Sequence, residues 1–326
     1  MLRSSIRTIA VMTSGGDAPG MNPGIRAVVR SALANGLRVM GIENGYEGML
    51  HGSFRPMGAR DVGGILQRGG TILQTARSME FKTPQGQRTA IRNLNNAEID
   101  AVVILGGDGS LTGGHMLSQQ GVPVVGVPAS IDNDIYGTDM CIGVDTALNT
   151  IVDAIDKLRD TASSHNRAFL VEVMGRDHGY LATQAGIICG AEVVLVPEFE
   201  TPFEEISGAV DDAYKRGKSH AIMVVAEGYR LSANEVAAKL EELQLGFTTR
   251  VTVLGHIQRG GKPSAFDRFL ATRFGYKAVE FLLQGQSGVM TALNGRDIEP
   301  ISLATVVSKK KTLSQENFQM ARALAR

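Results

Sequence analysis

Residues 101–134 read AVVILGGDGSLTGGHMLSQQGVPVVGVPASIDND. Two short apolar runs, 101–105 and 122–127, lie on either side of a helix-length segment near residues 111–119. Short apolar runs that end at glycine or proline are typical of buried strands, and two parallel strands need a crossover of helix length between them. The stretch therefore predicts a strand–helix–strand unit in which a polar loop, GGDGS or SIDND, follows each strand.

The same alternation runs through the rest of the chain. An apolar run at Ile6–Thr13 precedes a predicted helix at Pro23–Asn35, for which Asn22 is expected as the N-cap. Further apolar runs at 168–173, 192–196, 221–226 and 251–254 alternate with amphipathic segments, and a last long helix is expected at 265–283. This order predicts an α/β fold with doubly wound, mostly parallel sheets, in which ligands bind beyond the carboxyl ends of the strands.

The composition argues against several classes of protein. The 326 residues suffice for one large or two medium domains, and 43% of them are hydrophobic. The 33 Lys and Arg residues balance 33 Asp and Glu residues, which argues against a general nucleic-acid-binding protein. No apolar run reaches the about 18 residues of a membrane span, and the polar start of the chain is too short for a signal peptide. Cys141 and Cys189 stand in no CxxC spacing, so a cytoplasmic protein is expected.

Two glycine-rich loops follow predicted strands and precede predicted helices. The first is TSGGDAPGMN at residues 13–22, and the second is GGDGS at residues 106–110. Glycine lets backbone N–H groups approach an anion, and the N-terminus of the following helix adds partial positive charge. Asp108 in the second loop suits Mg²⁺, which is usually held by one or two carboxylates and by phosphate oxygens. The alternatives are a tight turn for the first loop and an ordinary helix start for the second.

The loop Pro128–Asp134 combines two carboxylates, Asp132 and Asp134, with the hydroxyl of Ser130. An Asp beside a phosphate loop can accept the proton of an attacking hydroxyl, so the loop suits phosphoryl transfer, with an Asx-turn as the alternative. Arginines also occur near predicted strand ends, where guanidinium groups bind phosphate in a bidentate manner. They are Arg167, Arg176, Arg250 and Arg259.

Together these segments resemble the bacterial ATP-dependent 6-phosphofructokinases. TSGGDAPGMN, GGDGS, SIDNDI, VEVMGR and VLGHIQRGG all stand in the order and spacing of that family, along nearly the whole chain. The resemblance implies transfer of the ATP γ-phosphate to the 1-hydroxyl of fructose 6-phosphate in glycolysis, with Mg²⁺ as cofactor. It also implies a phosphofructokinase fold of two doubly wound domains: a larger ATP-binding domain (1–143 with 256–304) and a smaller sugar-phosphate-binding domain (144–255 with 305–326).

The resemblance also assigns roles to individual residues. Asp132 is expected to be the catalytic base beside Ser130, Asp108 the Mg²⁺ ligand, and Arg77 and Arg176 the groups that stabilise the transferred phosphate. The expected ATP contacts are Gly16, Arg77, Gly107, Asp108, Gly109 and Ser110. The expected sugar-phosphate contacts are Ser130, Ile131, Asp132, Arg167, Met174, Gly175, Arg176, Glu227, Arg250, His256, Ile257, Gln258 and Arg259.

The resemblance further implies a homotetramer. Arg167 and Arg250 would reach the active site from a neighbouring subunit, and an allosteric anion, phosphoenolpyruvate or a nucleoside diphosphate (ADP or GDP), would bind between subunits. Ala59 stands where the family has an arginine, with Arg60 beside it, so the preferred effector and the strength of regulation stay open. The residues that match the effector pattern are Arg26, Arg30, Arg159, Gly190, Glu192, Arg216, Lys218 and His220.

Two small residues, Gly109 and Ala129, indicate which phosphoryl donor the protein uses. Pyrophosphate-dependent relatives carry Lys at the position of Ala129 and Asp at that of Gly109, whereas the ATP-dependent family usually has Gly at the former position and Thr in place of Ser130. Small side chains leave room for the ATP α-phosphate, so ATP is the expected donor. A pyrophosphate-dependent enzyme, a lipid or NAD kinase with a GGDG loop, and a catalytically silent subunit are the alternatives. The last predicts loss of Asp132, Asp108 or Arg176, and all three are present.

Overall fold

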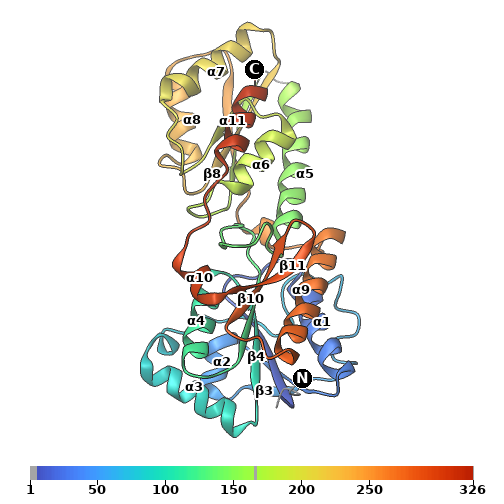
Figure 1. Ribbon diagram of the computed structural model, residues 1–326. Helices are drawn as coiled ribbons and strands as arrows, with labels where there is room; N and C mark the ends of the chain where they lie inside the picture. The colour runs from blue at the N-terminus through green and yellow to red at the C-terminus, as the bar shows by residue number, and fades with distance from the viewer. Residues whose placement is uncertain (1–5, 165–166, 326) are drawn as a thin grey trace. The chain divides into compact units, whose positions relative to one another are not determined.

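The computed structural model describes residues 6–164 and 167–325 and divides the chain into two compact units (Figure 1). Unit 1 comprises Met1–Thr146 and Arg259–Lys311, and unit 2 comprises Ala147–Gln258 and Thr312–Arg326. The chain passes between the units after Thr146, Gln258 and Lys311, which is three, three and seven residues after the expected crossings at 143, 255 and 304. Residues 256–258 belong to unit 2, contrary to expectation, because the Gln258 amide is bonded to Met174 and Gly255 of that unit.

The described part of unit 1 is built on a seven-stranded sheet in the order β11-β10-β5-β4-β1-β2-β3. The central strands are parallel, while β3 and β11 run antiparallel at the two edges. The strands are β1 (Thr8–Ser14), β2 (Arg38–Ile42), β3 (Phe54–Pro56), β4 (Ala101–Gly106), β5 (Val124–Pro128), β10 (Val289–Asn294) and β11 (Asp297–Ser302).

Helices cover both faces of this sheet (Figure 1). They are α1 (Met21–Ala34), α2 (Gly45–His51), α3 (Pro84–Asn96), α4 (Asp108–Gln119), α9 (Ala265–Leu283) and α10 (Leu303–Ser308), with a 3₁₀ turn at Glu80–Lys82. α1 packs closely on α9 because glycines let the two backbones approach: a Cβ on Gly275 would lie 2.6 Å from the carbonyl oxygen of Gly24. β1, β4 and β5 are buried along their whole length, as continuous apolar runs in a covered parallel sheet should be.

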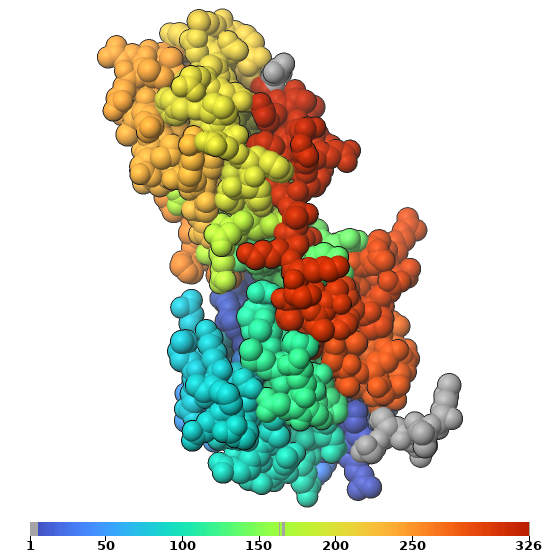
Figure 2. All heavy atoms as spheres, turned by 60° about the vertical axis from the view of Figure 1, so that its left-hand side comes forward, coloured from blue at the N-terminus to red at the C-terminus, as the bar shows by residue number. Residues whose placement is uncertain are grey.

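Unit 2 is a second α/β unit. Its described strands form a four-stranded, all-parallel sheet in the order β7-β8-β6-β9. Its C-terminal helix α11 packs against α6 and β7, and Figure 2 shows its surface (red) beside the yellow segments of the same unit. The elements are α5 (Val144–Ser163, which begins in unit 1), β6 (Arg167–Val173), α6 (Tyr180–Cys189), β7 (Val193–Leu195), α7 (Phe203–Lys215), β8 (His220–Ala226), α8 (Ala233–Glu242), β9 (Thr248–Val253), a 3₁₀ turn (Gly255–Arg259) and α11 (Gln315–Leu324).

The predicted fold class is confirmed, but the predicted cap of the first helix is wrong. α1 begins at Met21 after Gly20, whose φ of 112° suits glycine. Asn22 lies inside the first turn, where its Nδ2 donates to the carbonyl oxygens of Arg68 and Gly69 and its Oδ1 accepts from the Ile72 N–H. Its amide therefore fastens a distant loop instead of capping its own helix. Among the helices of the described ranges, none has the length and apolar character needed to cross a membrane.

Candidate active site

Three sequence-predicted loops meet at one edge of the sheet of unit 1. β1, β4 and β5 are neighbours, and their last residues are in register: Ser14 pairs with Gly106, and Gly106 pairs with Pro128. The loops 15–20, 107–110 and 129–134 therefore all start at the carboxyl edge of the sheet. This is the position at which doubly wound sheets bind ligands.

The two glycine-rich loops touch each other. Gly15 has a φ of 85°, and a Cβ there would lie 3.1 Å from the Ser110 Oγ. The second loop is held by its own backbone, since the Ser110 N–H donates to the Gly107 carbonyl oxygen (2.9 Å), and by the Tyr46 hydroxyl, which donates to the Ser110 carbonyl oxygen at 2.5 Å. α1 begins at Met21, near the end of the first loop, and α4 begins at Asp108, within the second. The N-termini of both helices bring partial positive charge to this edge, which suits phosphate.

Gly109 and Gly107 differ in the space around them. A Cβ on Gly109 would meet no atom within 4 Å, whereas one on Gly107 would lie 3.8 Å from the Ala129 carbonyl oxygen. Gly109 is thus free of packing constraints and takes no left-handed φ, so the fold does not require glycine there. Ala129 itself is buried, with 1% of its surface exposed. An absent side chain at an unconstrained, exposed position is consistent with space reserved for a ligand.

The loop after β5 orders a carboxylate and a hydroxyl. Asp132 is 3% exposed, and its N–H donates to the Ser130 Oγ at 3.3 Å. The Ser130 hydroxyl in turn donates to the Asp134 Oδ1 at 3.0 Å, and Ile131 between them is fully buried. The Ser130 hydroxyl therefore forms an ST-turn, made by a hydroxyl and not by the Asx side chain of the alternative interpretation, and this turn holds the Asp132 backbone.

The charges beside Asp108 fit a divalent cation. Burial raises the pKa of Asp108, and the negative charge of Asp134 raises it further, while the positive charge of Lys310 opposes both effects. Asp108 lies in the first turn of α4 and Asp134 on the loop after β5, and both carboxylates are hard oxygen donors of the kind that Mg²⁺ prefers. No cluster of three or more His, Cys, Asp or Glu side chains suited to a metal occurs among the described residues.

Arg77 and Arg259 also belong to unit 1. The segment before Arg77 is fastened to the end of β1, because the Thr13 Oγ1 donates to the Gln74 carbonyl oxygen at 2.8 Å. Arg77 itself is exposed. Arg259 lies against the first glycine loop: its Nη1 donates to the Asp17 carbonyl oxygen at 3.3 Å, and a Cβ on Gly16 would come within 2.6 Å of the same nitrogen.

Unit 2 presents a second group of predicted residues at the carboxyl edge of its own sheet. Val173 at the end of β6 pairs with Ala226 at the end of β8, so the loops that follow lie side by side. The Glu227 Oε1 accepts from the N–H groups of Gly175 (3.3 Å) and Arg176 (2.8 Å). The buried Gln258 accepts from the Met174 N–H at 3.2 Å. The structure thus brings Met174–Arg176, Glu227 and Gln258 together.

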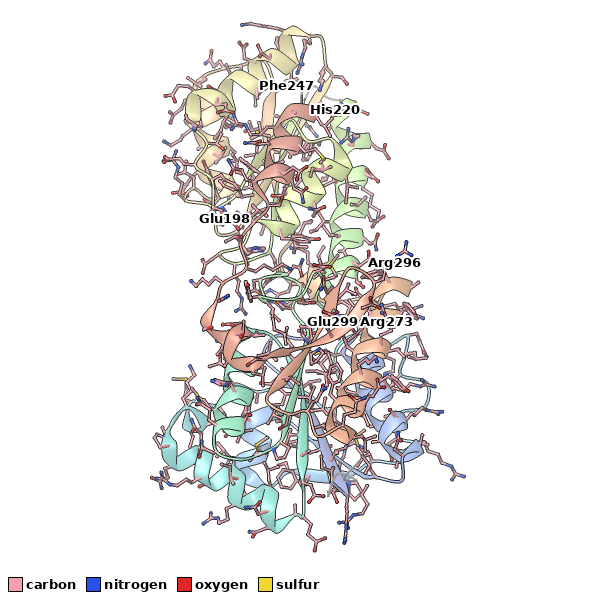
Figure 3. All side chains as sticks on the ribbon, viewed as in Figure 1. Glu198, His220, Phe247, Arg273, Arg296 and Glu299 are labelled. Carbon is pink, nitrogen blue, oxygen red and sulfur yellow. The ribbon has the colours of Figure 1, made fainter. Side chains whose placement is uncertain are left out.

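Strained backbone and a further carboxylate fix this loop. Gly175 has a φ of 140° and Arg176 a φ of 51°, and a Cβ on the neighbouring Gly228 would lie 1.9 Å from the Arg176 carbonyl oxygen. Glu198, labelled in Figure 3, accepts from the Gly179 N–H at the start of α6 (2.9 and 3.1 Å) and lies 4.0 Å from the His178 Nε2. The Arg176 side chain is exposed on a backbone that its neighbours hold in an uncommon conformation.

Arg167 and Arg250 do not join this group within one chain. Arg167 is the first residue of β6, at the opposite edge of the sheet from Met174, and six residues of strand span roughly 20 Å. Arg250 lies inside the edge strand β9, paired with Phe169, and is exposed. His256 and Ile257 occupy the 3₁₀ turn after β9, and Ile257 is 60% exposed.

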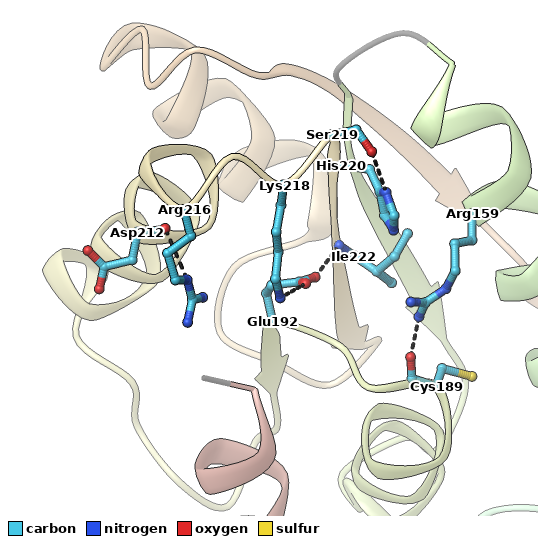
Figure 4. A network of polar contacts seen from close by, with 9 residues as sticks. All are labelled: Arg159, Cys189, Glu192, Asp212, Arg216, Lys218, Ser219, His220 and Ile222. Carbon is cyan, nitrogen blue, oxygen red and sulfur yellow. Dashed lines mark hydrogen bonds and ion pairs between the residues drawn. The ribbon is translucent and has the colours of Figure 1, made fainter.

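The predicted effector residues of unit 2 gather at the amino edge of its sheet (Figure 4). Glu192 pairs with the Lys218 Nζ at 2.8 Å and accepts from the Ile222 N–H at 2.6 Å, while Arg159 donates to the carbonyl oxygen of Cys189. Burial, and then the positive charge of Arg159, lower the pKa of His220. Gly190 ends α6 with a φ of 60°, and the Arg216 Nε donates to the Asp212 carbonyl oxygen at 3.2 Å.

The remaining two predicted effector residues, Arg26 and Arg30, lie on α1 of unit 1. The Arg30 Nη2 donates to the carbonyl oxygen of Ala59 at 3.5 Å. The position at which the resemblance led us to expect an arginine is therefore beside this helix.

Three residues near these loops were not predicted. Tyr46 holds the GGDGS loop, and Asn133 and Lys311 hold the loop that carries Asp132. For Asn133, the signal was its place directly after Asp132, since Asn often takes a left-handed φ in such turns. The lysine run 309–311 was visible too, but its contact with residues about 170 positions earlier depends on the folded chain.

The chain is similar to known proteins in both sequence and structure. Residues 8–282 match the sequence profile of the phosphofructokinase family. An ATP-dependent 6-phosphofructokinase of Thermotoga neapolitana is 50% identical over 321 residues, which cover 98% of this chain and 100% of the relative. Among solved structures, a phosphofructokinase of Pichia pastoris in the T-state aligns with a TM-score of 0.89 at 36% identity, covering 93% of this chain and 36% of the yeast chain. One of Saccharomyces cerevisiae gives a TM-score of 0.88 at 38% identity, covering 98% of this chain and 48% of that chain.

Proposed function

Because the chain belongs to the phosphofructokinase family, we propose that it is an ATP-dependent 6-phosphofructokinase, which transfers the ATP γ-phosphate to the 1-hydroxyl of fructose 6-phosphate. The products are ADP and fructose 1,6-bisphosphate. The observation that supports the proposal is the register of β1, β4 and β5, from which the two glycine-rich loops and the Asp132 loop start at one sheet edge. The substrates are charged metabolites of glycolysis, so the proposal includes a cytoplasmic location.

The donor side belongs to unit 1. Backbone N–H groups of Gly16 and of Gly107–Gly109, together with Ser110 and the N-termini of α1 and α4, bind the phosphates of ATP. The open space at Gly109 and the small Ala129 favour ATP over pyrophosphate, because a side chain there would compete with the α-phosphate. Arg77 adds positive charge at this edge. When bound, Mg²⁺ supplies charge neutralisation to the ATP phosphates, and Asp108 is the protein group that would hold it.

The acceptor side includes the proposed base, Asp132. Asp132 accepts the proton of the 1-hydroxyl as that oxygen attacks the γ-phosphorus, and the Ser130 hydroxyl holds the Asp132 backbone in place for this step. In unit 2, Glu227 orients Met174–Arg176 for the sugar, and Arg176 stabilises charge on the transferred group. His256, Ile257, Gln258 and Arg259 complete the set for the sugar and its 6-phosphate.

The proposal includes a homotetramer with shared active sites. Arg167 and Arg250 are assigned to the 6-phosphate, yet in one chain Arg167 lies at the wrong edge of the sheet to reach Arg176. Donation to a neighbouring subunit's site resolves this mismatch. The basic cluster around Glu192, with Arg26 and Arg30 of α1, is assigned to an anionic effector, phosphoenolpyruvate or a nucleoside diphosphate.

The test is a coupled assay with purified protein. Formation of fructose 1,6-bisphosphate is measured from fructose 6-phosphate with MgATP or with pyrophosphate as donor. We expect turnover with MgATP and at least about 100-fold less with pyrophosphate. Turnover with pyrophosphate alone would refute ATP as donor, and no turnover with either would refute the proposed reaction.

A further inference from the structure

The side chain of Asn133 closes the loop that carries Asp132. Asn133 is fully buried and has a φ of 51°. Its Oδ1 accepts from the Cys141 N–H at 3.0 Å, and its Nδ2 donates to the Asp139 carbonyl oxygen at 3.2 Å. One side chain thus connects the residue that follows Asp132 to the returning arm of the loop, which then pairs with the start of the loop through Ile142 and Ser130 (3.2 Å).

Lys311 fastens the same loop from outside. Its Nζ donates to the carbonyl oxygens of Thr138 (2.8 Å) and Asp139 (3.1 Å), so the Asp139 oxygen accepts from both Lys311 and Asn133. The Thr138 Oγ1 accepts from the Leu293 N–H at 3.0 Å, which ties the loop to β10. Burial lowers the pKa of Lys311, as is expected for an ammonium that is withdrawn from water to bond backbone oxygens.

The conformation at residue 133 sets the direction in which Asp132 is presented. A left-handed φ reverses the chain immediately after Asp132, and an L-residue holds it only when its surroundings compensate for the cost. The hydrogen bonds of Asn133 supply that compensation. Without them the peptide between residues 132 and 133 is free to rotate, and a base displaced by about 1 Å can lose on the order of 100-fold in rate.

We propose that Asn133 and Lys311 are positioning residues for Asp132: they fix the geometry of the loop from which the base accepts its proton, and they touch no substrate themselves. The inference rests on the proposed function, since it needs Asp132 to be the base. A positioning role and a purely structural role predict different kinetics. Loss of positioning lowers kcat far more than it weakens binding, because the groups assigned to ATP and to the 6-phosphate lie on other loops and only Ser130, Ile131 and Asp132 of the sugar contacts lie on this one.

Two pairs of variants test this. Asn133→Gly keeps the left-handed φ accessible and removes both hydrogen bonds, whereas Asn93→Ala is the matched control. The Asn93 Nδ2 also donates to two backbone carbonyl oxygens, those of Met49 (3.2 Å) and Leu50 (2.7 Å), far along the chain from the Asp132 loop. Lys311→Met removes the two outer hydrogen bonds, and Lys311→Arg keeps a cation able to donate to both oxygens.

The full-length proteins are compared by kcat, by KM for each substrate, by the pH profile of kcat and by thermal unfolding. We expect kcat of Asn133→Gly to fall about 10- to 100-fold with both KM values within about threefold of wild type, and the acid limb of the profile to move. Lys311→Met should lose kcat and Lys311→Arg should recover most of it. Asn93→Ala should unfold at a lower temperature with unchanged kcat.

Three results would overturn the inference: a folded Asn133→Gly protein with kcat near wild type, an equal loss of kcat in Asn93→Ala, or a Lys311→Arg protein as impaired as Lys311→Met. If Asn133→Gly does not fold, the Lys311 pair decides. A wild-type protein that turns over normally and depends on Asp132 leaves the proposed function standing while these variants refute the positioning. A wild type inactive with fructose 6-phosphate and either donor overturns both.

Discussion

Replacement of Gly109 by aspartate tests the assignment of the phosphoryl donor. A Cβ at this position meets no atom within 4 Å, and the residue takes no left-handed φ, so the substitution costs the fold nothing in packing or strain. Gly109 lies in the first turn of α4, where an acidic side chain interacts favourably with the helix dipole. The unfolding temperature of Gly109→Asp should therefore equal or exceed that of the wild type.

Although the substitution does not destabilise the fold, it should weaken the binding of ATP. A carboxylate on Gly109 and a phosphate oxygen bound by the same loop would be about 5 Å apart, and two unit charges at that distance repel by about 0.8 kcal/mol at a dielectric constant of 80 and about 3 kcal/mol at 20. Repulsion of about 1–3 kcal/mol corresponds to a rise of about 5- to 150-fold in KM for ATP. KM for fructose 6-phosphate should change by less than about twofold, because its assigned contacts lie on other loops.

The assay varies MgATP at saturating sugar phosphate for the wild type, Gly109→Asp and Gly109→Asn. The asparagine side chain has nearly the shape of aspartate without its charge. The variant therefore separates the steric effect on ATP binding from the electrostatic effect. We expect the KM for ATP of Gly109→Asn to be several-fold lower than that of Gly109→Asp. Raising the ionic strength should reduce the difference in KM for ATP between the two variants, since salt screens exposed charges. Identical ATP saturation curves for the wild type and Gly109→Asp would show that the residue does not face the nucleotide.

Two further predictions concern the assembly. Asp132→Asn and Arg250→Ala, each poorly active alone, should regain activity at low sugar concentration when they are unfolded together and refolded one to one, because roughly a quarter of randomly assembled sites combine both intact parts. Hybrids no more active than their parents would place Arg250 in its own chain's site. Phosphoenolpyruvate or ADP should shift the fructose 6-phosphate saturation curve by a coupling of about 1–3 kcal/mol, and Arg159→Ala should reduce that shift. A wild-type curve that neither anion moves would show that the effector site is not functional, with Ala59 as the first position to examine.

The sequence was sufficient for the parts of the fold that rest on local patterns. The helix predicted at 265–283 has the bounds of α9, and the strands predicted at 101–105 and 168–173 end within one residue of β4 and β6. These segments are continuous apolar or amphipathic runs, so their pattern can be recognised locally. The loops that follow them could be placed at the carboxyl edge because every parallel strand ends there.

Features that depend on tertiary contacts could not be read in the same way. Asn22 has the residue type of a helix cap, but its amide satisfies the backbone of residues 68–72 instead. The hairpin of β10 and β11 was missed although Asn294-Gly295 is a turn signal, because its strands mix polar residues and include Pro300. The bond from Lys311 to Thr138 spans 173 residues, and no local pattern reports it.

We propose above all that Asp132 removes the proton of the attacking hydroxyl. The most direct measurement is kcat for fructose 1,6-bisphosphate formation from MgATP by the wild type and by Asp132→Asn, with the affinity for fructose 6-phosphate measured in parallel. We expect a loss of roughly 10²- to 10⁴-fold in kcat, with sugar affinity and unfolding temperature close to those of the wild type. An Asp132→Asn protein that keeps a near-normal kcat would contradict this proposal.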